Sequence, residues 1–461
     1  MRILLLNPPG KKIYVRNYYC SSTSKASYLF HPIDLVMLSA RLSEGGNTLF
    51  FRDAIADHLS PEKSLNEIAR LNPDAVVALT GCVSWNEDIV FFNSLKKRLP
   101  ETTIIVGGDL FFDNPESFLK EHPSLSAIYF DFISQDVNHY LAGDFEHVRN
   151  MAFRQNDTVI VRKNKPEPKD LNDFPVPRQD LFISKNYRFP FAKRHPFATI
   201  LTSYGCPYDC LFCVGGNIGF ASRDSENVLK EIMMLKELGV SEIFFEDFTF
   251  GIPRKNIVKL LDAIIQNRML ISWTCFSRVD VLDRDMLCKM KEAGCHTIIF
   301  GVESGDERIL KLYNKKYTKD QVTAAFKHCK EIGIRTAGTF IIGLPEETEE
   351  SCLATIRFAK ELDCDFASFN VAVPRSGTAL REKSIEKKLI KDEDIQFDHS
   401  GDEIAMATNH LNKEEVLRLK RLAVREFYFR PGYILRRIRN LSSFWELRQH
   451  VSESWSLFRK N

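Results

Sequence analysis

Short apolar runs alternate with amphipathic stretches along the N-terminal third of the chain. This alternation is typical of a parallel sheet with helices on both faces. Ser60 and Asn114 each precede a proline, and a capping side chain before a proline predicts a helix start. We therefore expect an α/β domain, doubly wound and Rossmann-like (flavodoxin-like), over residues 1–145. Its predicted strands are Arg2–Leu6, Thr48–Arg52, Ala75–Leu79, Thr103–Val106 and Ala127–Phe130.

The ends of these strands predict a ligand site. In doubly wound sheets, ligands bind beyond the carboxyl ends of the strands, near the point where the strand order reverses. Those ends carry Asn7-Pro8-Pro9 after the first strand, Thr80–Ser84 after the third and Gly107-Gly108 after the fourth.

A linker and a second α/β domain follow. Residues 146–195 contain a hairpin pattern and then several prolines that interrupt regular structure. Six further βα units predict a partial (β/α)6 TIM-type barrel over residues 196–380, with its active site at the carboxyl ends of the strands. The predicted barrel strands are Thr199–Ser203, Glu242–Glu246, Ile271–Phe276, Thr297–Gly301, Thr336–Ile342 and Phe366–Val373.

The remaining region, residues 381–461, is predicted to be helical and is rich in arginine and aromatic residues. Two interpretations stay open: the helices pack on the barrel while the arginine heads stay in water, or they contact a membrane surface or a lipid substrate. The first is the commoner arrangement. The residues concerned are Arg418, Lys420, Arg421, Arg425, Phe427, Tyr428, Phe429, Arg430, Tyr433, Arg436, Arg437 and Arg439.

Composition narrows the class of protein. A net charge of +2 gives no general attraction to nucleic acid, and none is expected as a partner. No signal-peptide pattern and no membrane-spanning run is present, and the odd number of cysteines, 11, favours a reducing cytoplasm. Most of these cysteines are interpreted as small buried apolar residues: Cys82, Cys275, Cys288, Cys295, Cys329, Cys352 and Cys364.

Three other cysteines form a motif. Cys206, Cys210 and Cys213 directly follow the first predicted barrel strand, where barrel chemistry is located. An iron–sulfur cubane is usually held by four cysteines, so three of them leave one iron with an open position. An open metal position is a reactive one. The alternative is a closed zinc site completed by His195 or a remote cysteine, although this spacing is atypical of zinc.

With this motif, residues 196–380 resemble the radical S-adenosylmethionine (SAM) superfamily. The resemblance extends to Gly239–Asp247, Gly301–Gly305, Gly343–Pro345 and Pro374–Thr378. It implies a [4Fe-4S] cluster on the three cysteines that passes one electron to SAM. Methionine and a 5′-deoxyadenosyl radical are released, and the radical abstracts hydrogen from the substrate.

The resemblance also implies where SAM is bound. Glu246 and Asp247 would meet the methionyl amino group, because carboxylates accept hydrogen bonds from ammonium groups. An arginine can clamp a carboxylate with two bonds, as implied for Arg278. Taken alone, each such side chain could equally be a solvated or ion-paired group at a strand end. The complete implied set is Phe212, Glu246, Asp247, Arg278, Glu303 and Ser304.

The order of the two domains resembles the cobalamin-binding subclass of that superfamily. Asp53-Ala-Ile55 stands where cobalamin domains carry Asp-x-His-x-x-Gly, so the resemblance implies a histidine-off cobalamin. Phe130–Gln135 also departs from the subclass, which often has a Gly-Glu-Gly-Glu-like loop there. The alternative is a domain that has lost its ligand and serves for packing or as a lid. The implied cobalamin contacts are Asn7, Pro8, Ser84, Gly107 and Gly108.

The function implied is a cobalamin-dependent methyltransferase acting on an unactivated carbon, or on phosphorus, of a small molecule, lipid or natural-product intermediate. One alternative uses the same cofactors for cyclisation or rearrangement without methyl transfer. Another, from a different class, is a non-catalytic binding module stabilised by a metal. An enzyme of this kind requires an electron donor such as flavodoxin or ferredoxin.

Overall fold

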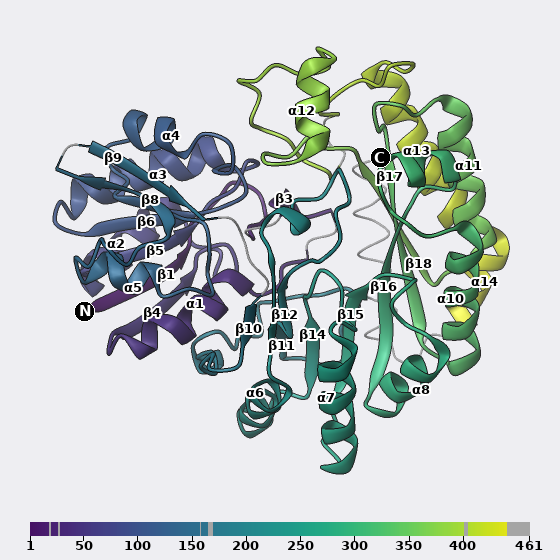
Figure 1. Ribbon diagram of the computed structural model, residues 1–461, viewed down its shortest axis with the longest axis horizontal. Coiled ribbons are helices and arrows are strands. Elements are labelled where there is room, and N and C mark those ends of the chain that lie inside the picture. The colour runs from purple at the N-terminus through teal and green to yellow at the C-terminus, as the bar shows by residue number, and fades with distance from the viewer. Residues whose placement is uncertain (18–19, 26–27, 157, 165–168, 401–403, 440–461) are drawn as a thin grey trace.

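The computed structural model describes residues 1–17, 20–25, 28–156, 158–164, 169–400 and 404–439. An N-terminal α/β domain lies beside a half-barrel, and helices near the C-terminus cover the outer edge of that half-barrel (Figure 1). The predicted fold class is confirmed. The part of the predicted helical tail over residues 440–461 lies outside the described residues.

The N-terminal sheet has the strand order β4-β1-β5-β6-β7-β8-β9. Its first five strands are parallel and follow the flavodoxin order, with the reversal between β1 and β5. The strands are β1 (Arg2–Asn7), β4 (Thr48–Asp53), β5 (Ala75–Leu79), β6 (Thr103–Gly107), β7 (Ala127–Tyr129), β8 (Asn150–Gln155) and β9 (Thr158–Lys163). The hairpin β8–β9 was predicted for the linker, but it pairs antiparallel with β7 and extends this sheet.

Helices cover both faces of this sheet, which explains why β5 is apolar and buried throughout. One apolar core contains residues of α1 and α5, and the other contains residues of α2, α3 and α4. Both predicted starts are confirmed, since Ser60 and Asn114 cap α2 and α4. The helices are α1 (Ile33–Glu44), α2 (Pro61–Leu71), α3 (Trp85–Arg98), α4 (Pro115–Glu121) and α5 (Asp136–Leu141).

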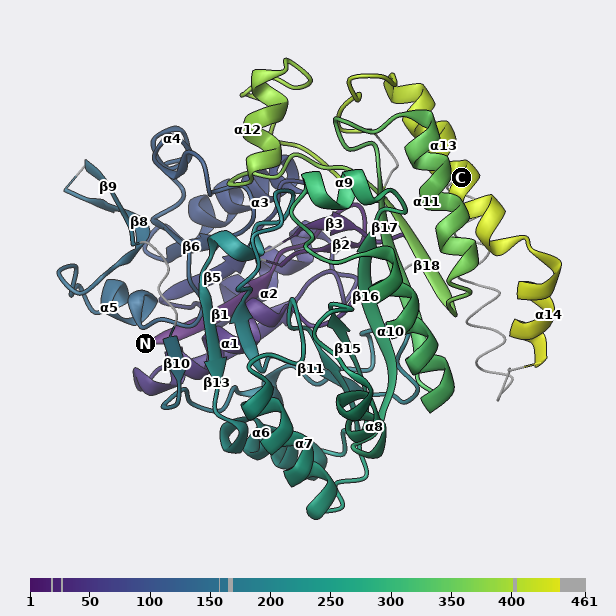
Figure 2. The same cartoon turned by 45° about the vertical axis from the view of Figure 1, so that its right-hand side comes forward.

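A long loop joins β1 to α1 and was not predicted. It contains a two-stranded hairpin, β2 (Tyr14–Val15) and β3 (Ser22–Thr23). Figure 2 places this hairpin between the N-terminal sheet and the half-barrel. The loop therefore contributes to the region where the two domains meet.

The second domain is a six-stranded parallel sheet in sequential order, as a partial barrel requires (Figure 2). Its strands are β11 (Phe197–Ile200), β14 (Glu242–Phe245), β15 (Ser272–Ser277), β16 (Cys295–Glu303), β17 (Arg335–Ile342) and β18 (Phe366–Val371). A small separate sheet, β10-β13-β12, joins the domains and contains β10 (Lys169–Leu171), β12 (Ser203–Gly205) and β13 (Phe220–Arg223).

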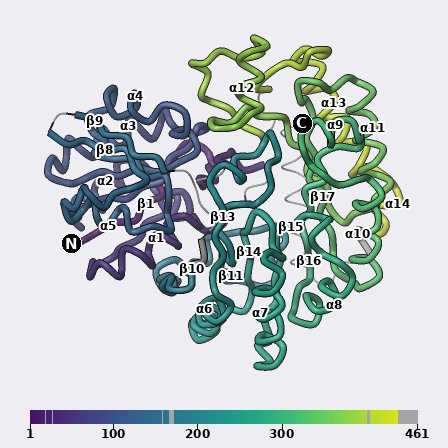
Figure 3. The backbone as a smooth tube through the Cα atoms, in the orientation of Figure 1, coloured from purple at the N-terminus to yellow at the C-terminus, as the bar shows by residue number. Residues whose placement is uncertain are grey.

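Helices line the outside of the half-barrel and bury a continuous apolar core against it (Figure 3). They are α6 (Ser225–Glu237), α7 (Arg254–Gln266), α8 (Arg284–Glu292), α9 (Glu307–Leu312), α10 (Lys319–Ile332) and α11 (Glu349–Glu361). Six of the seven cysteines interpreted as apolar residues are buried. Cys288 is the exception, because it lies on the solvent-facing side of α8 and is exposed. That interpretation was wrong for Cys288.

The C-terminal helices are α12 (Ala379–Glu386), α13 (Lys413–Tyr428) and α14 (Pro431–Arg439). The apolar face of α13, including Leu419 and Phe427, is buried against the barrel core, as the first interpretation of the tail requires. Lys420 departs from that interpretation, which places the charged groups of the tail in water, because this lysine is buried. Among the described residues, no helix is both long enough and apolar enough to cross a bilayer.

Candidate functional site

The loop that carries the three cysteines is fixed by its glycines. Gly205 has a φ of +70°, and a Cβ there would lie 1.8 Å from the carbonyl oxygen of Gly219, so only glycine fits. Cys206 donates its backbone N–H to the carbonyls of Gly215 (3.1 Å) and Gly219 (3.2 Å). The loop after β12 therefore closes on itself and holds the cysteines in a defined position.

Each cysteine sulfur has a polar neighbour. The Sγ of Cys206 lies 3.7 Å from Thr249 Oγ1, and the Sγ of Cys213 accepts a backbone hydrogen bond at 3.4 Å. Arg278 donates from Nη1 to the Sγ of Cys210 at 3.6 Å. Burial raises the pKa of the Cys206 thiol above its usual value and that of Cys213 to about 12. Because metal ligands are thiolates, binding of a cluster must release these protons.

The spacing of the three cysteines along the chain favours a cluster over zinc, because a three-residue gap followed by a two-residue gap is atypical of zinc sites. Among the described residues, one group of three potential metal ligands has all its ligand atoms within 4.8 Å of one another. It lies in the N-terminal domain and consists of His139, Asp144 and His147. The three cysteines are not such a group. His195 lies before β11, at the other end of that strand from the cysteines. A three-thiol set of this kind fits an iron–sulfur cluster.

Glu246 follows β14 and is buried between the domains. Its Oε1 accepts a hydrogen bond from Asn17 Nδ2 at 3.3 Å, whereas its Oε2 is buried without a hydrogen-bond partner. Burial, reinforced by the nearby Asp34, raises the pKa of Glu246 well above its ordinary value. This carboxyl group is therefore an unfilled acceptor, which suits an incoming ammonium group.

Asp247, like its neighbour, has one oxygen, Oδ2, that is buried without a hydrogen-bond partner, but its other oxygen holds the backbone. Its Oδ1 accepts hydrogen bonds from the N–H and hydroxyl groups of Thr202 (3.0 and 2.8 Å) and Ser203 (2.5 and 2.7 Å). These bonds break the single predicted strand Thr199–Ser203 into β11 and β12. Asp247 thereby orients the segment that leads into Cys206. Its implied contact with SAM stays a prediction.

Arg278 follows β15 and reaches the cysteine loop. Its guanidinium lies 3.8 Å from the centre of the Tyr208 ring. Asp280 accepts from its Nε (3.0 Å) and Nη2 (2.8 Å), and the carbonyl of Lys315 accepts from Nη2 (2.8 Å). The arginine is held rigidly beside Cys210, so its cation lies next to the sulfur of that cysteine.

A lysine that the sequence did not single out joins this group. Glu303, at the end of β16, adopts a φ of +68° and accepts from Lys315 Nζ at 3.0 Å. The same ammonium lies 5.6 Å from the centre of the Phe212 ring. Ser304 is directed elsewhere, since its Oγ lies 3.2 Å from Thr355 Oγ1. Four of the six implied SAM residues, Phe212, Glu246, Arg278 and Glu303, thus present side chains around the cysteines or at the barrel mouth.

The residues implied for cobalamin lie at the carboxyl ends of the N-terminal strands, as predicted. Their polar groups are already bonded within the protein: the Asn7 amide contacts Asp53 and Arg16, and the Ser84 hydroxyl contacts Arg16 and Asp88. Any corrin contact would therefore come chiefly from other groups at this edge.

The two glycines at this edge are required by the protein itself. A Cβ on Gly107 would lie 2.1 Å from the Tyr129 ring, and one on Gly108 would lie 2.4 Å from the carbonyl of Thr80. The close approach that the sequence suggested is thus to protein atoms.

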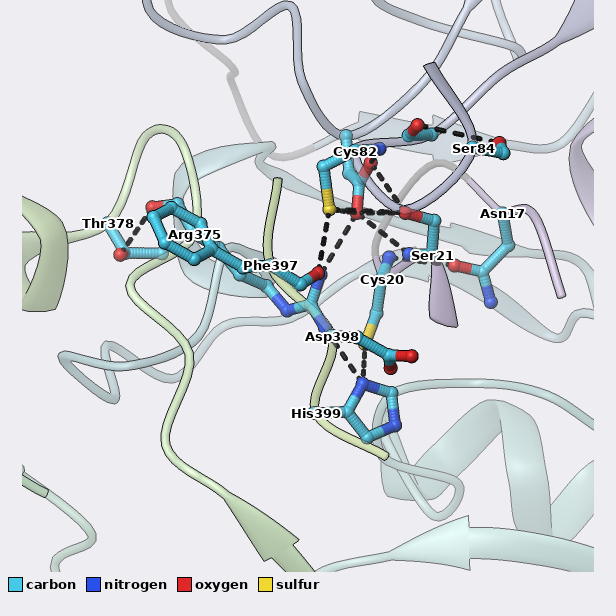
Figure 4. Close-up of polar contacts among 12 residues, drawn as sticks. Asn17, Cys20, Ser21, Cys82, Ser84, Arg375, Thr378, Phe397, Asp398 and His399 are labelled. Atoms are coloured by element: carbon cyan, nitrogen blue, oxygen red, sulfur yellow. Dashed lines mark hydrogen bonds and ion pairs between the residues drawn. The ribbon is translucent and has the colours of Figure 1, made fainter. Parts of the chain in front are cut away.

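The strand ends face a polar cluster built from distant parts of the chain (Figure 4). Asp109, after β6, accepts from Arg375 Nη1 at 2.9 Å, and Arg375 Nη2 lies 2.9 Å from His399 Nδ1. Cys20 Sγ lies 3.7 Å from the same nitrogen. We name Cys20, Asp109, Arg375 and His399 the interdomain cluster. Sequence reasoning missed it, although Arg375 lies within the Pro374–Thr378 motif.

Known proteins resemble the chain over most of its length. The uncharacterized methyltransferase PH0819 of Pyrococcus horikoshii is 31% identical over 449 residues, which are 95% of each chain. The structure of the cobalamin-dependent SAM radical enzyme OxsB gives a TM-score of 0.70 at 16% identity, covering 99% of this chain and 72% of that one. The radical SAM methyltransferase TsrM of Kitasatospora setae gives 0.65 at 16% identity, covering 84% and 78%.

A barrel mouth that carries three cysteines at this spacing defines an iron–sulfur enzyme class in which one iron is left open. The family model described as the Radical SAM superfamily matches residues 200–359, which contain all three cysteines and the strands that follow them. With the full-length relative, this match settles the family: the chain belongs to the radical SAM superfamily. Its two-domain fold is that of the solved members OxsB and TsrM.

Glu246 gives a pH-dependent prediction. A carboxyl group whose pKa is raised by folding destabilises the folded state progressively as the pH rises above its unfolded pKa of about 4.3. Glu246→Gln removes this penalty, so the variant should have a higher thermal midpoint than wild type at pH 8, and the difference should shrink toward pH 5. Thermal melts across this range measure it.

Glu237→Gln, on the exposed side of α6, is the matched control and should leave the pH profile unchanged. If Glu246→Gln and wild type lose stability in parallel as the pH rises, the carboxyl group is ionised in the folded protein and this description is wrong.

Proposed function

We propose that this protein is a cobalamin-dependent radical SAM methyltransferase that acts on an unactivated carbon or on phosphorus of a small molecule. The proposal rests on one observation: the three-cysteine loop and the predicted cobalamin edge of the N-terminal sheet lie in the same region between the two domains. The three-cysteine loop lies at the barrel mouth, and the strand ends of a flavodoxin-type sheet face the same region through the interdomain cluster. A methyltransferase similar over 95% of the chain supports it.

The bound groups would supply the chemistry: a [4Fe-4S] cluster gives an electron to SAM, and a methylated cobalamin gives the methyl group. The chain holds and orients them. Cys206, Cys210 and Cys213 are the cluster ligands that we propose, and Arg278 lies beside the second of them. Glu246 offers its unfilled oxygen to the methionyl ammonium group.

The chain also keeps water away from the reaction. Glu246, Asp247 and Arg278 are all almost fully buried at the strand ends. The loop between β1 and α1 covers Glu246, since Asn17 contacts this carboxyl group and the N–H of Cys20 donates to Asn17 Oδ1 at 2.7 Å. Exclusion of water protects a reactive intermediate from side reactions.

Partners follow from the same proposal. We expect a one-electron donor protein such as flavodoxin or ferredoxin, and a cytoplasmic location in which thiols stay reduced. Contact with a membrane surface through the C-terminal region would suit a lipid substrate. Exposed Ile434 and Leu435 lie beside arginines in α14 and support that contact.

The experiment that tests the proposal follows the fate of SAM. Reduced protein reconstituted with iron, sulfide and cobalamin is incubated with SAM labelled in the methyl group, with the protein-free small-molecule fraction of a cell extract as the source of candidate substrates. Methyl transfer predicts S-adenosylhomocysteine together with 5′-deoxyadenosine. A radical cyclase or rearrangement enzyme would give 5′-deoxyadenosine alone, and that result would overturn the methyltransferase proposal.

A further inference from the structure

A histidine–aspartate–histidine group lies in the N-terminal domain, away from the half-barrel. His139 is on α5, and Asp144 and His147 are in the loop that follows it (Figure 1 shows α5). Nδ1 of His139 lies 2.9 Å from Asp144 Oδ2, and Nδ1 of His147 lies 2.7 Å from Asp144 Oδ1. The two imidazole rings are 5.5 Å apart. Two ring nitrogens thus converge on a single carboxylate.

The backbone around this group is fixed on both sides. Gly143 turns the chain with a φ of +74°, and the N–H of Asp144 returns to the carbonyl of His139 at 2.9 Å. The far end of the loop is held by Arg162 on β9, whose Nη1 donates to the carbonyl of Val148 at 3.0 Å. The three side chains therefore project from a scaffold that is already ordered.

The start of α5 is tied to the end of the same loop. Asp136 accepts backbone hydrogen bonds from Arg149 (2.8 Å) and Asn150 (3.0 Å), which enters β8. Phe145, inside the loop, stacks on Phe153 of β8 with 5.4 Å between ring centres. Little backbone freedom would be lost on binding a ligand here, so binding would cost little conformational entropy.

We propose that His139, Asp144 and His147 bind a divalent transition-metal ion of the zinc type. Two imidazole nitrogens and one carboxylate are a common donor set for such ions. Metal–ligand bonds of roughly 2.1 Å place tetrahedral ligands about 3.4 Å apart, so the nitrogens and the carboxylate would separate by about half an ångström from their present contacts. The side chains are 36%, 39% and 62% exposed, which gives them room to do so.

The ion would join the end of α5 to the loop that enters β8. Water would complete its coordination, because these donors are open to solvent. The site is separate from the three cysteines, and no step of the proposed reaction uses it. Its expected role is to stabilise the edge of the N-terminal sheet.

Zinc binding to tag-free, cluster-loaded protein tests the proposal. Zn²⁺ is titrated in competition with a chromophoric chelator, and one ion per chain should bind with a dissociation constant in the micromolar range or tighter. His139→Ala and His147→Ala should each weaken binding on the order of 100-fold, since even outer-shell partners of metal ligands are worth 10–100-fold. His410→Ala, which removes an exposed imidazole elsewhere, should have no effect.

Iron content and cluster absorbance should be the same in all variants, which shows that they fold and separates this site from the proposed catalytic one. Binding only at millimolar Zn²⁺, or equal binding by wild type and the His139→Ala/His147→Ala double variant, would mean adventitious association and would overturn the proposal. Co²⁺ offers a second readout. Bound at this site in tetrahedral coordination, it should give intense visible absorption bands, and the double variant should lose them.

Discussion

Replacing Cys210 by alanine should abolish reductive cleavage of SAM. With one of its three thiolates removed, the loop keeps too few ligands to hold a cubane, and iron should fall from about four per chain toward zero. The same loss is expected for Cys206→Ala and Cys213→Ala. Iron analysis and release of 5′-deoxyadenosine from dithionite-reduced protein measure the effect.

Cys288→Ala is the matched control, because this thiol is exposed on α8 and far from the loop in sequence. It should retain full iron and full cleavage. Wild-type levels of iron and deoxyadenosine in any one of the three loop variants would show that this cysteine is not a cluster ligand and would contradict the proposed three-cysteine site.

The second large effect concerns stability. Arg16 and Asp88 form an ion pair at 2.6 Å in which both side chains are completely buried. Arg16→Met leaves the carboxylate buried without its cation, which typically costs about 3–5 kcal/mol. For a domain of this size, such a loss lowers the thermal midpoint by roughly 6–20 °C. Melting followed by circular dichroism checks this.

The control is Arg52→Met. Arg52 contacts Glu67 at 3.0 Å, but the two side chains are 52% and 39% exposed. Exposed pairs contribute about 1 kcal/mol or less, so this variant should melt within about 4 °C of wild type. Similar midpoints for the two variants would show that the buried pair contributes no more than a surface pair.

Local patterns predicted most of the strands to within two residues. Ala75–Leu79 is identical to β5, and Thr103–Val106 differs from β6 by one residue, because apolar runs bounded by turn signals mark buried parallel strands. The largest difference is the first barrel strand. The predicted strand is split into β11 and β12 because the Asp247 carboxylate, more than 40 positions away, accepts hydrogen bonds from the N–H groups of Thr202 and Ser203. No pattern near residue 200 contains that information.

The candidate site was predictable where one motif supplies it. The three cysteines lie within one loop, whereas Lys315 becomes part of the site only because the bulged end of β16 turns Glu303 toward it. The interdomain cluster joins Cys20 to His399, and such a contact depends on the packing of whole domains. Cys20 had no signal in the sequence beyond being a single cysteine.

The contacts between Asp109 and Arg375, and between the Cys82 thiol and the carbonyl of Phe397, join residues separated by 266 and 315 positions. During synthesis on the ribosome, the N-terminal sheet therefore emerges long before the groups that cover its carboxyl edge exist. Domains generally fold as units, the N-terminal one first, so this sheet can form before the later residues that contact it are made. The part of that edge around Asp109 and Cys82 lacks these contacts until nearly the whole chain has been translated.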